Sequence, residues 1–470
     1  MSKDYTQERL DMLNRRMNIV ENGSNCFERL VDFDDNTNSK ILFGNPMEVA
    51  AFRNRRRCNV LDNGVISAWV NDPEYTEDGW NGQVMVYQPK FYYKVQPLKL
   101  SANTETGGQG YIMNKCIIGI SDGPAPGYKL HPLFINEKGN VVDYVFLGAF
   151  EACLFDTSEG AYIEYDTVGD CSVGGDKLSS IAEVIPASGL NTVSGGVDDL
   201  GFTRTGMEVT AQNRGKGWHM TNIQAVSANQ LMMALEYSFN TQLGLGNGVA
   251  VGKDNVNYNC SVYTGATAYN SPIDGSTQTL VEKEDYPTQT GSSTKTHSRL
   301  SEGESGLVDY SETGMIPQTA SNWQSVSYRG MENPYGNIFE VVNGVNITGN
   351  TLGGIPYVCT DYNYSDTNTT SYKSTGITIP GSDGWIKYFG YNKPEFDWMF
   401  WPIANGAPSD GSGVIGDYLT RTNSSNIRIS RLGGAWNNSS HVGGFFWNLN
   451  GDVGLRGRVN GARLMYIPQL

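Results

Sequence analysis

The sequence predicts an α+β chain that is mostly β, and three observations lead to this fold class. Charged residues make up only 18% of the 470 residues, while glycine occurs 56 times and tyrosine 26 times. This composition argues against disorder and favours a loop-rich β protein. Short apolar runs separated by glycine and aspartate clusters recur at about 40–205 and again after residue 330. One long helical pattern lies between these two regions, within 206–242.

Residues 1–45 are predicted to be a helical segment for anchoring or oligomerisation. A seam of apolar side chains at a spacing of three and four residues runs along 4–21: Leu10, Leu13, Met17 and Val20. Two interpretations stay open, a helix docked on its own domain or a helix that associates with another chain. Because a lone helix of this length is marginal in water, the seam needs a partner surface.

Residues 46–205 are predicted to form a β-rich middle domain. The stretch 82–95 alternates well between apolar and polar side chains, and Pro89 interrupts it. Similar short runs occupy 65–70 and 140–150. Turn-forming glycine pairs separate these runs, so we expect several short strands.

Residues 206–470 are the third predicted domain, with a long polar insertion at about 250–325. Asn222 is a plausible N-cap for the helix that follows it, and the apolar stripe of this helix ends before Gly244. We predict that the core of this domain contains six large side chains: Trp218, Leu231, Leu235, Phe339, Trp436 and Arg463.

The charge balance excludes several classes of partner. Thirty-four basic residues stand against 49 acidic ones, which gives a net charge of −15. We therefore expect no nucleic-acid binding, because phosphate neutralisation needs a basic surface. The one basic run, 53–57, is either a solvated or interface strip or an anion contact. No run of 18 apolar residues exists, so no membrane span is expected. The seven cysteines are widely spaced, which argues against a disulfide framework and favours folding in a reducing cytosol.

Catalytic motifs give little support to an enzyme. The four histidines show no metal-binding spacing, and no nucleophile elbow, P-loop or dinucleotide fingerprint occurs. We interpret His131 and His219 as structural residues. Paired carboxylates for glycoside hydrolysis need no fixed spacing, so four acids are kept as candidates: Glu332, Glu340, Asp361 and Asp366.

Four short segments occur in a fixed order: 217–222 (GWHMTN), 328–344 (YRGMENPYGNIFEVVNG), 431–436 (RLGGAW) and 461–464 (GARL). Together they resemble the landmarks of the formylglycine-generating-enzyme type of C-type lectin fold. The resemblance covers roughly 200–470 and implies a C-type-lectin-like domain there.

The same resemblance bears on metal and redox chemistry. In some members of the family the segment that corresponds to Asn337, Ile338 and Glu340 ligates calcium, so the resemblance implies a calcium site and no other cofactor. The oxidising members carry a cysteine pair before the last motif, whereas 445–463 holds no cysteine here. Without a thiol the oxidase chemistry is lost, and we predict that the chain is not an enzyme.

A second resemblance lies in the first half of the chain. The segments 81–95 (NGQVMVYQPKFYYKV), 128–134 (YKLHPLF) and 145–150 (VFLGAF) resemble a module of tailed-bacteriophage structural proteins. With the later motifs the resemblance covers about 60–470. It implies a virion protein, made in the host cytoplasm, whose partners are other virion proteins and a bacterial surface glycan or protein. Fibres of this kind are commonly homotrimers.

The resemblance also implies a receptor-binding face between the last two motifs. Polar amides and aromatic rings, which contact glycans and proteins at little entropy cost, gather there. Ten residues form the predicted site: Asn437, Asn438, Ser439, Ser440, His441, Phe446, Trp447, Asn448, Asn450 and Asp452. The alternative is an ordinary exposed loop.

Three functions follow from these observations. The first is a tail-fibre or receptor-binding adhesin that recognises the bacterial surface. The second is a purely architectural virion component, such as a head fibre, decoration or collar protein. The third is a glycan-degrading enzyme. Host-cell binding separates the first from the second, and glycan degradation by the purified protein identifies the third.

Overall fold

The structure is a computed structural model of the 470-residue chain. The described residues are 25–104, 106–163, 169–182, 184, 186–188, 202–245, 305–307, 326–350, 353–421, 426–435, 438, 441–455, 457 and 459–469. The predicted helix at 4–21 and nearly all of the predicted insertion lie outside these residues.

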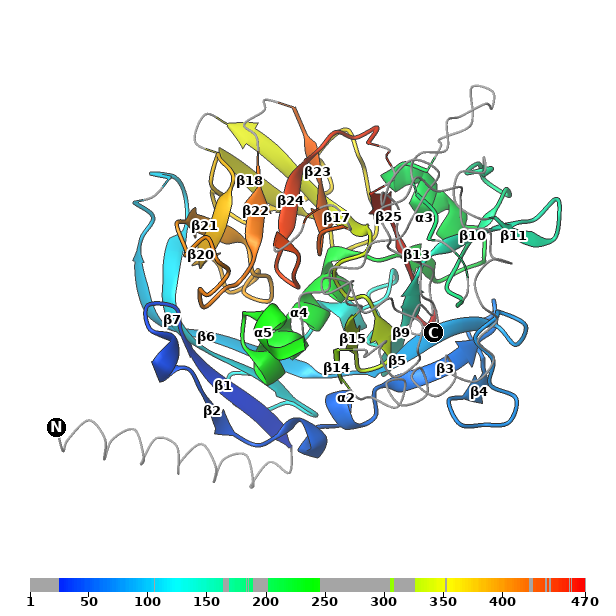
Figure 1. The fold of residues 1–470 in the computed structure, drawn as a ribbon, viewed down its shortest axis with the longest axis horizontal. Helices are drawn as coiled ribbons and strands as arrows, with labels where there is room; N and C mark the ends of the chain where they lie inside the picture. The colour runs from blue at the N-terminus through cyan, green and yellow to red at the C-terminus, as the bar shows by residue number, and fades with distance from the viewer. Residues whose placement is uncertain are drawn as a thin grey trace, which may run out of the picture.

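The largest described sheet crosses the molecule and combines strands from both halves of the chain (Figure 1). Its main path follows the order β19 (Lys373–Ser374), β18 (Gly353–Val358), β17 (Phe339–Asn350), β23 (Arg428–Leu432), β24 (Trp447–Gly451), β22 (Tyr418–Thr420), β20 (Gly384–Tyr391), β7 (Tyr111–Ser121), β1 (Cys26–Asp32) and β2 (Lys40–Phe43). Four strands join beside this path: β6 (Tyr92–Ala102), β8 (Lys129–Leu130), β21 (Pro402–Asn405) and β25 (Asn460–Gly461).

A second sheet of six described strands also combines distant segments. Its order is β13 (Trp218–Met220), β26 (Arg463–Tyr466), β9 (Tyr144–Glu151), β5 (Gln83–Pro89), β3 (Arg56–Val60) and β4 (Ile66–Trp69). Two three-stranded sheets complete the described strands: β10 (Cys153–Asp156), β11 (Ala161–Ile163) and β12 (Lys177–Ser179), and then β14 (Ser305–Leu307), β15 (Val326–Tyr328) and β16 (Met331–Glu332).

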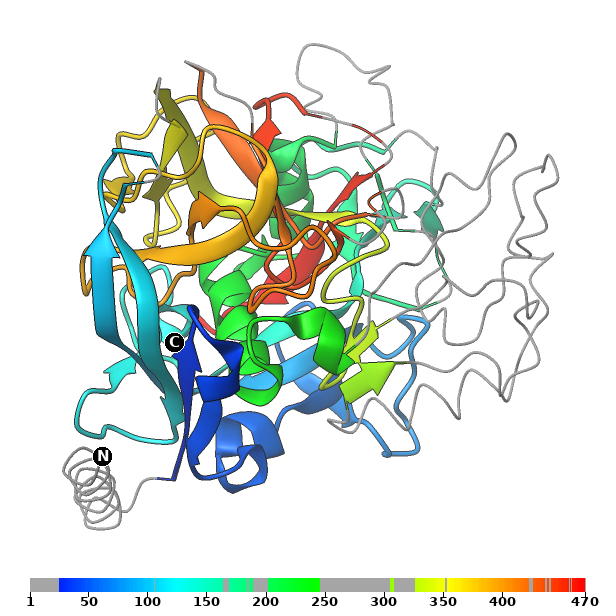
Figure 2. The ribbon, with the colours of Figure 1, turned by 60° about the vertical axis from the view of Figure 1, so that its left-hand side comes forward.

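The fold-class prediction of an α+β chain, with a β-rich middle domain followed by a separate C-type-lectin-like domain, is wrong. The described residues are mostly β, and the sheets cross the predicted junction. In one, β20 lies beside β7 (Figures 1 and 2), and Gly390 of β20 pairs with Ile112 of β7. In the other, Met465 of β26 pairs with Leu147 of β9. Where an independently folding unit begins and ends stays a prediction.

The helix α4 (Ile223–Tyr237) is central to the fold (Figures 1 and 2). As predicted, Asn222 caps it, because its side chain accepts a hydrogen bond from the backbone N–H of Ala225 at 3.0 Å. Twelve of its fifteen residues are buried, so α4 is enclosed on nearly every side. The other described helices are α2 (Ala50–Arg53), α3 (Arg204–Gln212) and α5 (Thr241–Leu245), with short 3-10 turns at Asn36–Asn38, Pro46–Glu48 and Pro132–Phe134.

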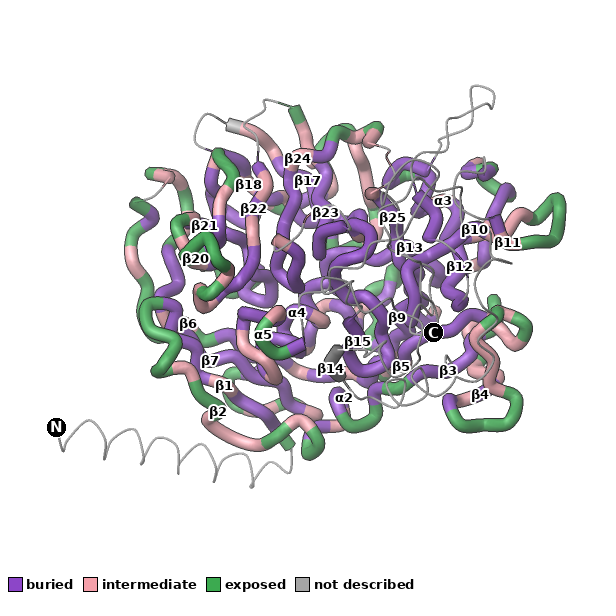
Figure 3. Tube along the Cα trace, in the orientation of Figure 1, coloured by how far each residue is buried: buried purple, intermediate pink, exposed green. Residues whose placement is uncertain are grey.

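The predicted core is largely confirmed. Buried residues run through the strands and helices in the middle of the molecule (Figure 3). Five of its six members are buried: Trp218, Leu231, Leu235, Phe339 and Arg463. The sixth, Trp436, lies outside the described residues. No helix in the described ranges is long and apolar enough to cross a membrane.

The basic run 53–57 enters the strand β3, which divides its side chains between two faces. Arg56 points outward and is exposed, whereas Arg55 and Arg57 are buried. The buried guanidinium of Arg57 donates to the carboxylate of Glu77 at 2.7 Å. It also donates to the carbonyl of Gly330 at 2.6 Å. Arg57 therefore makes internal contacts, which neither the strip nor the anion-contact interpretation of this run included.

Candidate binding surface

The structure separates the ten predicted receptor-binding residues into three groups. Three of them lie outside the described residues: Asn437, Ser439 and Ser440. Three are buried: Phe446, Trp447 and Asn448. Four reach the surface at least in part: Asn438, His441, Asn450 and Asp452. The predicted segment is therefore a surface loop that turns back into the core.

The buried group is part of the packing. The ring of Trp447 lies 4.7 Å from that of Trp401, and both rings are buried. Phe446 packs against Phe339 with ring centroids 5.5 Å apart. Because these side chains are inaccessible, replacing Trp447 tests the stability of the fold, and it does not report on a receptor contact.

The loop that carries His441 is closed at its base by hydrogen bonds. Gly433 donates its N–H to the carbonyl of Phe446 at 3.0 Å, and Gly443 donates to the carbonyl of Gly433 at 3.3 Å. Gly433 and Gly434 have φ angles of 87° and 84°, a conformation that favours glycine. The glycine pair of the RLGGAW segment therefore turns the chain out of β23 into this loop.

Asp417 anchors the loop from inside. Its fully buried carboxylate accepts the N–H of Phe445 at 2.6 Å and a side-chain N–H of Gln242 at 3.3 Å. Burial raises the pKa of Asp417 to about 7. A Cβ at Gly443 would lie 1.9 Å from this carboxylate, so the loop needs glycine at that position.

His441 belongs to an aromatic cluster at the surface. Its ring stacks on Tyr418 with centroids 4.1 Å apart and planes inclined by 12°. Trp385 meets the edges of both rings, at 5.6 Å from Tyr418 and 5.3 Å from His441. The pairing of β20 with β22 places Trp385 beside Tyr418, and the loop adds His441. Trp385 is buried, while the other two rings are half-buried.

The rings of this cluster are uncharged at neutral pH, and the carboxylate of Asp383 lies near them. Burial lowers the pKa of His441 despite the nearby Asp383, so its imidazole is neutral at pH 7. Burial, with a smaller contribution from Asp383, raises the pKa of Tyr418. Asp383 is exposed and accepts the N–H of Arg421 at 2.5 Å. We name His441, Tyr418, Asn438 and Asp383 the His441 surface.

The predicted calcium ligands make internal contacts instead. The amide of Asn337 and the N–H of Ile338 both donate to the carboxylate of Glu151, while Glu340 pairs with Arg463 at 3.2 Å. Burial raises the pKa of Glu151 to about 8, although Arg463 opposes this shift. A guanidinium and a weakly acidic carboxyl are poor neighbours for calcium. These residues therefore do not fit the ion, and the described residues contain no cluster of three metal-binding side chains.

Each of the four candidate catalytic acids has its own contacts or buried position, and none of these contacts joins two of them into the pair that glycoside hydrolysis needs. Glu340 faces Arg463, and Asp366 pairs with the buried Arg204. Asp361 accepts a hydrogen bond from the thiol of Cys359. Glu332 is buried in β16.

Both histidines that we interpreted as structural are buried within hydrogen-bonded networks. His131 accepts the N–H of Leu133 at 3.3 Å, and burial lowers its pKa to about 3. His219 lies between Glu208 and Glu137, each 2.7 Å from one ring nitrogen. Burial alone would lower the pKa of His219, but the two carboxylates raise it to about 9. These contacts agree with a structural role for both residues.

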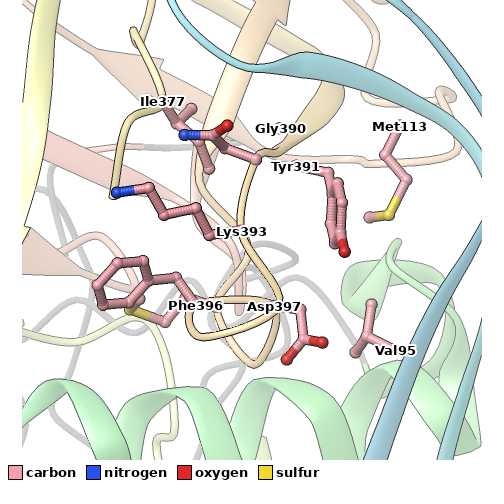
Figure 4. Close-up of a pocket in the computed structure, with 10 residues that line it drawn as sticks. Val95, Met113, Ile377, Gly390, Tyr391, Lys393, Phe396 and Asp397 are labelled. Carbon is pink, nitrogen blue, oxygen red and sulfur yellow. The ribbon is translucent and has the colours of Figure 1, made fainter. Parts of the chain in front are cut away.

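A small recess lies between β7, β20 and the loop after β20 (Figure 4). Asp397 at its base is buried and accepts hydrogen bonds from Tyr93 at 2.6 Å and Lys129 at 2.5 Å. The recess is too narrow to hold a water molecule. We therefore do not consider it a ligand site.

Comparison with known proteins gave a weak structural similarity and no match in sequence. No protein-family model matches the chain, and no curated protein sequence matches it. Among solved structures, the chain is similar to a Major Tropism Determinant U1 variant, with 11% sequence identity and a TM-score of 0.26. The alignment covers 88% of this chain and 72% of that one.

Proposed function

We propose that the chain is a bacteriophage virion protein of the tail-fibre or receptor-binding kind, and that it contacts the bacterial surface through the His441 surface. The observation that carries the proposal is the stacked pair of His441 and Tyr418 on a loop closed at its base. The resemblance of the middle and later segments to phage structural proteins supports the virion setting.

The arrangement of the later motifs favours binding over catalysis. Arg463 of the last motif contacts Glu340 and donates to the carbonyls of Glu332 and Asn333 in the second motif. Gly433 of the third motif accepts the N–H of Gly336 in the second. The second, third and last motifs therefore contact one another inside the molecule. We interpret them as the structural base of the loop that carries His441.

The chemistry of the His441 surface suggests the class of receptor. Neutral aromatic rings and an amide bind by stacking and by uncharged hydrogen bonds. Such groups suit an uncharged part of a surface glycan or protein. Because Asp383 is the only ionised side chain in the His441 surface, binding is expected to change little with salt.

A matched pair of variants tests the proposal. We expect His441→Ala to reduce adsorption of the phage to host cells by about tenfold or more, as loss of an aromatic contact at an interface does. Lys387→Ala, at an exposed position on β20, is the control and is expected to adsorb normally. The thermal unfolding temperature of each purified chain checks the fold. Normal adsorption by a folded His441→Ala variant would favour the architectural alternative.

Assembly and activity are proposed on the same basis. A homotrimer and contacts with other virion proteins follow from the resemblance to fibre proteins, and light scattering of the purified chain measures the oligomeric state. Incubating the purified chain with host polysaccharide tests the proposed lack of enzymatic activity. Release of reducing ends by the wild-type chain would support the glycan-degrading alternative.

A further inference from the structure

Trp80 is the most exposed large apolar side chain in the described ranges. Ninety per cent of its surface is accessible to water, which is unusual for so large a ring. It lies in the segment that joins β4 to β5. Two exposed apolar residues of the adjacent β3–β4 hairpin, Leu61 and Val65, are 39% and 54% accessible. Gly82 lies against the backbone of Val60 and Leu61, so the Trp80 segment is close to this hairpin.

The turn that carries Trp80 is well supported. The carboxylate of Asp78 accepts the N–H of Trp80 at 2.9 Å, and the N–H of Gly82 donates to the carbonyl of Gly79 at 3.3 Å. Asn81 donates to the carbonyl of Glu74 at 2.9 Å and accepts a hydrogen bond from the hydroxyl of Ser67. The ring is thus presented on a fixed backbone, which lowers the entropy cost of binding.

Acidic side chains border Trp80. Glu74 and Asp78, which hydrogen bond to Asn81 and Trp80, are both exposed, and no lysine or arginine of the described residues forms a salt bridge with them. Of the basic side chains on or beside the neighbouring hairpin, Lys177 and Arg214 pair with Asp62, and Arg56 stacks on the ring of Trp69 at 4.1 Å from its centroid. A projecting ring with an acidic border fits an apolar pocket bordered by basic residues.

We infer that Trp80 docks the chain onto a neighbouring virion protein that offers such a pocket, an inference that rests on the proposed function. β4, which leads into the Trp80 segment, and the strands of the His441 surface lie toward opposite ends of the long axis (Figure 1). An adhesin needs one surface for the particle and another for the host. A convex ring requires a concave protein partner, and its position leaves the His441 surface free.

The test uses particles prepared without this chain, to which the purified full chain is added. After the particles are sedimented, the bound chain is measured by immunoblot. We expect Trp80→Ala to bind roughly 10- to 100-fold more weakly, the usual loss for a central interface tryptophan. Leu243→Ala removes another exposed side chain, 76% accessible, and is expected to bind like the wild type.

Two further measurements separate the outcomes. Glu74→Lys and added salt are both expected to weaken binding, because the Glu74 side chain is exposed and the turn uses only its backbone carbonyl. The unfolding temperature of Trp80→Ala is expected to stay that of the wild type because the ring is in water. Wild-type binding by Trp80→Ala overturns the docking surface and leaves the adhesin proposal standing. If the wild-type chain neither occurs in natural particles nor binds the depleted ones, the proposed function and this inference both fall.

Discussion

His219 links protein stability to alkaline pH. Its ring nitrogens face Glu208 and Glu137, and these carboxylates raise its pKa to about 9, above the ordinary value near 6.5. A group whose pKa is raised on folding stabilises the native state fully below its unfolded pKa. This contribution is lost as the pH rises through the folded pKa. The wild-type chain is therefore expected to lose on the order of 3 kcal/mol of unfolding free energy between pH 6.5 and 9.5 from this residue.

The comparison with His219→Gln isolates this effect. The variant keeps a polar side chain without the ionisation, so the stability difference between wild type and variant is expected to shrink over the same pH range. Urea denaturation at each pH measures it. Glu151 and Asp417 also have raised pKa values, which makes stability fall with rising pH in both chains, so their effect cancels in the difference. A difference that stays constant with pH would contradict the prediction.

Gly443 is fixed by the carboxylate beside it. A Cβ at this position would lie 1.9 Å from an oxygen of the fully buried Asp417. We expect Gly443→Ala to destabilise the chain by about 1–3 kcal/mol or more, as overpacking of an interior does. Gly454→Ala is the matched control, since a Cβ there meets open space. Equal unfolding midpoints for the two variants would show that the loop accommodates the added methyl group without loss of stability, which would contradict the prediction.

Residue types alone revealed part of the candidate site. The polar and aromatic composition after the RLGGAW segment drew attention to His441, which does reach the surface. The same composition also selected Phe446 and Trp447, which are buried, because an aromatic residue is equally suited to a core and to an interface. Tyr418 and Asp383 were missed because strand pairing and a loop bring them to His441, and no local pattern encodes that contact.

At the scale of the elements, the sequence predicts the end of a helix or strand correctly where that end depends on the residues of the element itself. Asn222 caps α4 as its residue type suggests, and Pro89 ends β5. The stretch 82–95, however, contributes to two strands in different sheets, since β5 pairs with β9 whereas β6 pairs with β7. The alternation of apolar and polar side chains predicts strands here, but it does not indicate which strands they pair with. Sheet membership depends on residues far away in the chain.

The whole molecule is held together by strand pairs that join its two halves. If the fragment 206–470 is expressed alone, β26 lacks β9 and β20 lacks β7. Arg463 then also loses its hydrogen bond to the carbonyl of Gly148, 3.2 Å in the full chain. We expect this fragment to show no cooperative thermal unfolding. Co-expression with residues 1–205 is expected to restore it. A cooperative transition in the fragment alone would instead support the predicted domain boundary.

In the six-stranded sheet, β26 lies between β9 and β13. The edge of β9 that faces β26 therefore stays unpaired until β26 has been synthesised. β9 leaves the ribosome roughly 300 residues before its partner β26 does, a delay of about 15–60 s at ordinary elongation rates. During this interval one edge of β9 has no partner strand, and such an edge invites pairing with other chains. A nascent chain of this protein is thus exposed to mispairing until β26 arrives. Chaperones that shield such edges are then expected to bind the nascent chain during this interval.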